Sequence, residues 1–373
     1  MMLWQPLIVW VGRQFGYDLT VKRDIPTTQV DSTTQPSTTG PSTYLSPIAP
    51  STAPTGVWRV AASVEGPTTA PMSIGSAELH SKDYNLQVTA TPRGAGISSV
   101  VLNQYLATIY DKNRPFHFEE VVTDDTADRA RPLSTRSVRI GGNDVDLSGI
   151  NWNAIPTPGD ITVPAGSQAL TFRIELSDGT RTLQLDKTYI VHRRDVKDHL
   201  DDKELPVNES SQGYEVDVIH TLRNPGTVDI GDVKIGINGP VPPPSEAERY
   251  ADTYYLGGLI DSSNRFALVT HAAAGIKKDA VNLIKGAEGQ RPLWIAATTT
   301  YFDAILRQDR VGSAKFAQAD DWWENAEAVA LKPDATNADR AVIATINTKS
   351  LTVRPGATSL TMHAFFGPRS ASC

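Results

Sequence analysis

The chain has 373 residues, of which 40% are hydrophobic and 21% are charged, so it carries enough apolar side chains for a sizeable core. Its formal net charge of −7 argues against a nucleic-acid partner, because phosphate binding needs a basic face. Cys373 is the single cysteine, which excludes an intrachain disulfide and a cysteine-based metal site.

A short apolar segment, Leu3–Val11, opens the chain and is followed by Arg13. It is too short for a membrane span of about 20 residues, and it lacks the basic stretch that precedes the apolar run of a signal peptide. Two interpretations remain open for residues 1–24: a piece of core or interfacial segment, or the remnant of a membrane anchor.

Residues 25–72 are predicted to form a Ser/Thr/Pro-rich disordered linker. Between Ile25 and Gly56 the only charged residue is Asp31, and this composition cannot bury a core. The globular domain is therefore expected to span residues 73–370.

Apolar and polar residues alternate through most of that domain, which is typical of half-buried strands. Leu86–Ala90 leads into a bend at Arg93–Gly96, and two alternating runs flank Asp178-Gly179 as a hairpin. Further alternating runs are 214–222, 233–237, 342–346, 351–353 and 360–366, with turns at Asn224-Pro225-Gly226 and Pro355-Gly356. The fold class predicted is all-β, a sandwich of large antiparallel sheets.

One or two short helices are expected. Ser245–Glu248 reads as a capping box, which favours a helix over Glu246–Tyr254. Asp320–Ala330 is a second candidate, although Trp322 and Trp323 would also suit a strand.

The sequence contains no clear motif of a catalytic, cofactor-binding or metal-binding site. No two of its seven histidines have the spacing of a zinc site, and His220 lies on an apolar strand face, as a core histidine does. Asn143–Gly149 resembles a calcium loop, but Ile155 stands where such a loop needs glutamate, so a surface turn is the better interpretation. We therefore predict no catalytic, cofactor-binding or metal-binding residue, no cofactor and no enzyme activity.

Several segments resemble, in order, the large periplasmic domain of the YidC-type membrane protein insertases. They are Leu86–Leu102, Tyr214–Ile230, Pro292–Leu306 with Trp294-Ile295-Ala296 and Tyr301-Phe302, and the closing Val353–Gly356 and Phe365–Arg369. The resemblance covers about residues 74–369. The family's membrane-embedded insertase core has no counterpart in the sequence, so no groove residue can be carried over.

The resemblance implies a β-supersandwich on the periplasmic side of the inner membrane. Such a domain would assist the insertion and folding of membrane proteins by contacting Sec translocon components and nascent chains, without a small-molecule substrate, and could not insert proteins alone. It also implies that Trp294, Tyr301 and Phe302 pack in the core.

Two alternatives stay open. A carbohydrate-binding or carbohydrate-active β-sandwich needs only a few carboxylates brought together by the fold, and the chain has 42 acidic residues. Trp322-Trp323 could then stack on a sugar, although burial is the more usual fate of such a pair. The third reading is an adhesin-like module behind a Ser/Thr/Pro stalk.

Overall fold

The computed structural model describes a subset of the chain in which every regular element except one short turn is a strand. The described residues are 56–62, 72–108, 110, 112–120, 131–194, 213–242, 253–261, 263, 265–277, 279–285, 290–308, 310–311, 318–319, 322–331 and 342–369.

The largest sheet has ten strands. Its order is β1 (Arg59–Ala62), β9 (Gln168–Ser177), β10 (Thr182–Val191), β11 (Glu215–Asn224), β23 (Gly356–Pro368), β17 (Phe302–Gln308), β16 (Arg291–Thr298), β13 (Tyr254–Ile260) and β14 (Phe266–Ala272), with β8 (Asn153–Ile155) beside β9.

The second sheet has seven strands. Its order is β15 (Val281–Ile284), β20 (Trp323–Ala330), β21 (Val342–Thr348), β12 (Ile230–Asn238), β6 (Thr135–Ile140) and β7 (Asn143–Asp146), with β22 (Leu351–Val353) also pairing with β12.

Two smaller sheets complete the described architecture. A four-stranded sheet has the order β2 (Met72–Gly75), β3 (Leu86–Thr91), β4 (Gly96–Leu106) and β5 (Pro115–Glu120), and a ribbon joins β18 (Arg310–Val311) to β19 (Gln318–Ala319). The one helical element among the described residues is a 3-10 turn, η3 (Ala273–Gly275).

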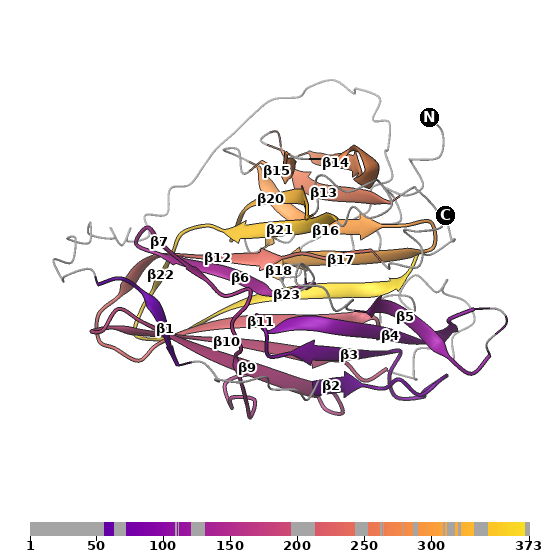
Figure 1. Ribbon diagram of the computed structural model, residues 1–373, viewed down its shortest axis with the longest axis horizontal. Helices are drawn as coiled ribbons and strands as arrows, with labels where there is room; N and C mark the ends of the chain where they lie inside the picture. The colour runs from indigo at the N-terminus through magenta and orange to yellow at the C-terminus, as the bar shows by residue number, and fades with distance from the viewer. Residues whose placement is uncertain are drawn as a thin grey trace, which may run out of the picture.

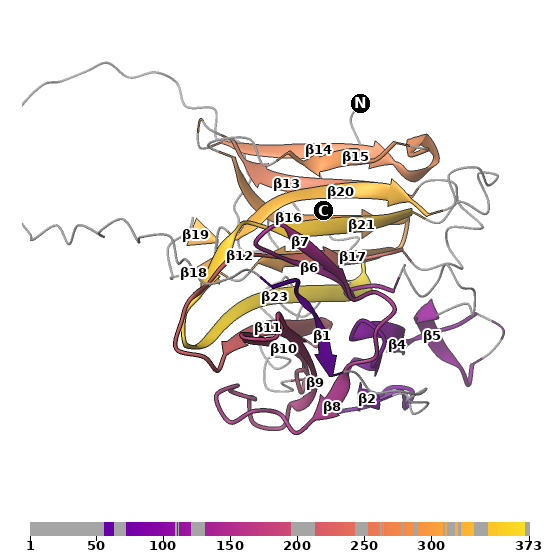
Figure 2. The same cartoon turned by 60° about the vertical axis from the view of Figure 1, so that its left-hand side comes forward.

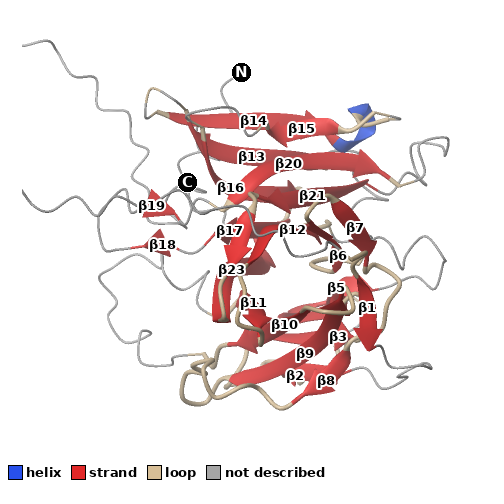
Figure 3. Ribbon diagram, turned by 90° about the vertical axis from the view of Figure 1, so that its left-hand side faces the viewer, coloured by secondary structure: helices blue, strands red, loops and turns tan. Residues whose placement is uncertain are grey.

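All strand pairs are antiparallel, and the sheets stack face to face. The ten-stranded sheet runs the height of the molecule in Figure 1, and the seven-stranded sheet covers its upper part while the four-stranded sheet lies near β9 and β10. Figure 2 and Figure 3 show the same layers from two other sides. The all-β sandwich of large antiparallel sheets is confirmed.

Burial on alternate positions places the core between these sheets. In β10 and β11 the inward residues Leu183, Leu185, Val216 and Val218 are fully buried. The predicted hairpin at Asp178-Gly179 is confirmed by the β9–β10 register, and the Asp178 carboxylate closes its turn by accepting hydrogen bonds from the amides of the next residues.

The Asn224-Pro225-Gly226 turn carries the chain from one sheet to the other. It leaves β11 in the ten-stranded sheet and enters β12 in the seven-stranded sheet. Asn224 donates hydrogen bonds through Nδ2 to the carbonyls of Val228 and Val353, which fixes this crossing.

Three sequence-based predictions are corrected by the fold. The helical reading of Asp320–Ala330 is wrong, because Trp323–Ala330 is strand β20 and its alternate side chains are buried against the core. Within the predicted disordered linker, Arg59–Ala62 forms β1 and Trp58 is buried, since its ring packs beneath the Arg181 guanidinium. Tyr301 is 55% exposed, because it lies in the turn before β17 rather than on a strand.

Trp294 and Phe302 are core residues, as predicted. Trp294 stacks on Phe266, and the Phe302 ring stacks on Phe116 at 4.4 Å between centroids, joining the ten-stranded and four-stranded sheets.

Other predictions concern residues outside the described set. Residues 1–24, most of 25–72 and residues 246–252 of the expected helix belong there, and Tyr254 itself begins strand β13. Among the described residues, no helix has the length and apolar character needed to cross a membrane.

Candidate functional site

A polar pocket lies on the face of the seven-stranded sheet that points away from the core. In β6 the side chains of Val138 and Ile140 enter the core, so Ser137 and Arg139 point to the opposite face. The pocket has a volume of about 640 Å³. Its lining comes from five neighbouring strands and one loop: Arg136, Ser137, Arg139, Asp144, Asp146, Ser148, Lys234, Ile235, Gly236, Glu324, Asn325 and Asn347.

One row of residues crosses the floor of the pocket from strand to strand. The sheet registers pair Asp146 with Ser137, Ser137 with Gly236, Gly236 with Asn347, and Asn347 with Asn325. Neighbouring strands lie about 4.8 Å apart, so the row spans about 19 Å. It presents a carboxylate, a hydroxyl, a bare glycine and two amides, which together offer both hydrogen-bond donors and acceptors.

Gly236 is the middle residue of this row and is buried. A Cβ atom at Gly236 would come within 2.6 Å of Ser137 Oγ and 3.3 Å of Arg136 Nη2. Glycine at this position leaves room for the Ser137 hydroxyl and the Arg136 guanidinium, which lie close over the buried Gly236 backbone.

Two β-bulges add charged side chains to the pocket. Gly236 and Ile237 pair with Ser137 and Thr135, so Arg136 is the extra residue of β6. Opposite β21, Glu324 is the extra residue of β20 in the same way. A bulge re-aims a side chain that simple alternation would send to the other face, and bulges occur often beside active sites.

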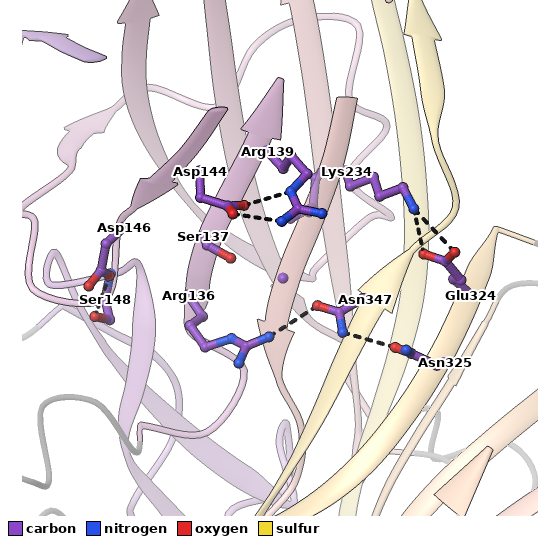
Figure 4. A pocket seen from close by; sticks show the side chains of 12 residues that line it. Arg136, Ser137, Arg139, Asp144, Asp146, Ser148, Lys234, Glu324, Asn325 and Asn347 are labelled. Atoms are coloured by element: carbon purple, nitrogen blue, oxygen red, sulfur yellow. Dashed lines mark hydrogen bonds and ion pairs between the residues drawn. The ribbon is translucent and has the colours of Figure 1, made fainter. Parts of the chain in front are cut away.

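Ion pairs and amide contacts hold these side chains in place (Figure 4). Arg139 donates two hydrogen bonds to Asp144, at 3.0 and 2.8 Å, and Lys234 Nζ lies 2.8 Å from Glu324 Oε2. A separate chain of hydrogen bonds, the amide chain, runs through the side-chain amides of Asn347 and Asn325. It begins at the Arg136 guanidinium, whose Nη2 donates to Asn347 Oδ1 at 3.0 Å. Asn347 Nδ2 then donates to Asn325 Oδ1 at 2.9 Å.

The charges of the pocket balance, with three cations, Arg136, Arg139 and Lys234, against three carboxylates, Asp144, Asp146 and Glu324. The hydrogen bond from Arg139 lowers the pKa of Asp144, and the charge of Arg136 adds to this effect. The same hydrogen bond raises the pKa of Arg139. Asp144 is therefore held ionised as a hydrogen-bond acceptor.

None of the pocket residues was predicted as a site residue from the sequence. Asn143–Asp146, interpreted as part of a surface turn, is strand β7 and brings Asp144 and Asp146 to the pocket. The alternation of Arg139, Asp144 and Asp146 with buried residues on a hairpin could have indicated a polar face. The bulges that bring Arg136 and Glu324 to the pocket leave no pattern in the local sequence.

The other residues weighed in the sequence lie elsewhere. His220 is fully buried, as predicted, and Trp322 and Trp323 are buried beside Gln308, whose Oε1 accepts hydrogen bonds from both backbone amides. The tryptophan pair is thus part of the core and not an exposed stacking surface. In the part of the chain that the structure describes, no cluster of His, Cys, Asp or Glu suits a metal ion.

No family model and no curated protein matches the chain. Among solved structures it is similar to a galactose mutarotase related enzyme from Lactobacillus acidophilus (11% identity, 80% of this chain and 97% of that chain, TM-score 0.43). It is also similar to a galactose mutarotase-like protein from Clostridium acetobutylicum (6%, 77% and 94%, TM-score 0.44). A third is the GH36 alpha-galactosidase of Geobacillus stearothermophilus (10%, 80% and 41%, TM-score 0.37).

These comparisons correct the identification made from the sequence. No family model matches the chain, and the similar solved structures are of the galactose mutarotase kind and not insertase domains. The insertase identification and the transport function drawn from it are wrong. The prediction of a chain without enzyme activity is corrected on the same finding, because a mutarotase related enzyme is among the similar structures.

The partners and the inner-membrane location expected from that identification are tested by none of these findings and stay predictions. The identities and TM-scores are too low to transfer any activity to this chain.

Proposed function

We propose that this protein binds a carbohydrate in the polar pocket of the seven-stranded sheet. The observation that carries the proposal is the floor row, in which side chains of both hydrogen-bonding types line up across five strands. Each hydroxyl of a saccharide both donates and accepts, so it needs neighbours of both types within a short distance.

The balance of charge supports a polyhydroxylated ligand over a highly charged one. Three cations and three carboxylates leave little net field, and two of the cations are already neutralised by Asp144 and Glu324. The side chains are also oriented before a ligand arrives, because the ion pairs and the amide chain hold them, which lowers the entropy cost of binding.

The central amide is the residue to test. Asn347 accepts from Arg136 and donates to Asn325, so its removal breaks the amide chain in the middle of the floor. Asn347→Ala is expected to weaken saccharide binding about 10-fold or more, because polar ligands lose affinity when a buried partner is left unpaired.

The measurement is isothermal titration calorimetry of the full chain with galactose, glucose, mannose and their disaccharides. Asn282→Ala is the matched control, since Asn282 is exposed on β15 of the same sheet and does not line the pocket. The proposal fails if the unaltered chain binds neither these sugars nor their uronic acids at millimolar concentration, or if Asn347→Ala binds them as well as the control does.

A further inference from the structure

The three cations of the pocket differ in how they are compensated. Arg139 forms a bidentate pair with Asp144, and Lys234 lies within hydrogen-bond distance of both oxygens of Glu324. Within the described residues Arg136 has no carboxylate at ion-pair distance, and its one side-chain partner is the neutral amide of Asn347.

Most of the hydrogen-bonding capacity of Arg136 is unused. A guanidinium carries five N–H donors, and a single one of them, on Nη2, reaches an acceptor in the described part of the chain. Its Nε is buried without a partner. An atom covered in this way is out of reach of a ligand, so the donors that an arriving acceptor can use are those on the two Nη groups.

The surroundings of Arg136 keep the guanidinium at the pocket floor. Arg136 is the extra residue of the β6 bulge, and its guanidinium lies next to the bare backbone of Gly236. The amide of Asn347 then fixes its orientation from β21. A planar, oriented guanidinium matches the two oxygens of a carboxylate.

We infer that the pocket selects a saccharide bearing a single carboxylate, a uronic acid, and that Arg136 binds this carboxylate. The inference rests on the proposed saccharide function and names its substrate class. One uncompensated guanidinium matches one negative charge, and Asp144 and Asp146 at the same pocket disfavour a dianionic sugar phosphate.

The test compares ligands that differ in this one group. Calorimetry of the full chain is run with galacturonate and glucuronate, their methyl esters, the parent galactose and glucose, and the corresponding 6-phosphates. The acids are expected to bind about 10-fold or more tightly than their esters, because the ester removes the charge but keeps the ring hydroxyls.

Variants assign the effect to Arg136. In Arg136→Gln the acid and its ester are expected to bind alike, whereas Arg136→Lys keeps part of the preference because it keeps the charge without the planar fork. Arg354→Gln is the matched control, since Arg354 is exposed in the turn before β23 and lies outside the pocket.

The outcomes separate the two proposals. Equal binding of acid and ester, or tighter binding of a 6-phosphate, overturns the inference while the saccharide function stands. If no sugar of any kind binds, the proposed function fails and the inference fails with it. The ester comparison uses the unaltered chain, so it holds even if Arg136→Gln does not fold.

Discussion

Lys187 is a fully buried lysine between the two larger sheets. Its Nζ donates to the carbonyl of Leu133 and lies 3.4 Å from Thr135 Oγ1, while His220 pairs with it across β10 and β11. Burial lowers the pKa of Lys187 well below its ordinary value, and burial followed by the charge of Lys187 lowers the pKa of His220. The lowered pKa values favour the neutral forms of Lys187 and His220 in the folded chain.

Lys187 should make the stability of this protein rise with pH. Between the lowered pKa of Lys187 in the folded chain and about 10.5, the unfolded chain binds one more proton than the folded chain. Raising the pH through that window stabilises the folded state by about 1.4 kcal/mol per pH unit from this one group.

Urea unfolding at pH 7 and pH 9 checks this prediction. Lys187→Met should lack the Lys187 contribution, so the stability gained between the two pH values should be smaller than in the unaltered chain. Lys82→Met, at an exposed position, should behave as the unaltered chain does. The same pH dependence in Lys187→Met and Lys82→Met would contradict the account.

At the scale of elements, a single carboxylate fastens three strands of the ten-stranded sheet. Asp217 on β11 accepts hydrogen bonds at 2.7 Å from His192, just after β10, and from His363 on β23. Burial by itself would raise the pKa of Asp217, but the hydrogen bonds from the two histidines outweigh it and lower that pKa. The hydrogen bond to Asp217 raises the pKa of His192.

These two pKa shifts limit the pH range over which the contact stabilises the folded chain: Asp217 sets the lower end and His192 sets the upper end. The contribution of His192 is complete below its unfolded pKa near 6.5 and is lost as the pH rises through its raised folded pKa. The contribution of Asp217 is present above its unfolded pKa near 3.8 and is lost as the pH falls through its lowered folded pKa. The contact is therefore strongest between about pH 4 and pH 6.5.

Asp217→Asn is expected to lower the free energy of unfolding by about 1–3 kcal/mol at pH 6, and by less at pH 8.5. The measurement is urea unfolding at both pH values, with Asp83→Asn as the control, because Asp83 forms an exposed ion pair with Arg193. An equal loss of stability at the two pH values would show that the histidines do not act through Asp217.

The sequence predicted several of the strands, but none of the pocket residues. Local alternation predicted β3, the β9–β10 hairpin and the strands from β21 to β23, because burial on one face repeats every two residues. It did not reveal Arg136 and Glu324 as pocket residues. Each is defined as a bulge by a partner strand far along the chain, about 100 residues away for Arg136 and about 20 for Glu324.

For the whole molecule, the strand order explains why no local reading could assemble the sheets. β23, the last strand of the chain, lies between β11 and β17 in the middle of the ten-stranded sheet. β12 leaves β11 for the other sheet, where it lies beside β6, a strand from much earlier in the sequence. Such pairings depend on the tertiary fold and not on neighbouring residues.

The failure of the insertase identification has a physical reason at this scale. Alternating segments, glycine bends and Pro-Gly turns are what antiparallel sandwiches require in general, so their ordered recurrence indicates the architecture rather than one family. Fold does not fix function, and the function has to be argued from the pocket.

The central claim is that the pocket of the seven-stranded sheet is a saccharide site, and the most direct measurement is a map of where a saccharide binds. Amide chemical shifts of the isotope-labelled full chain would be followed during titration with galacturonate and with galactose. We expect the perturbed amides to cluster at Ser137, Gly236 and Asn347, which share the floor of the pocket. Perturbations confined to other parts of the molecule, or none at saturating sugar, would contradict the claim.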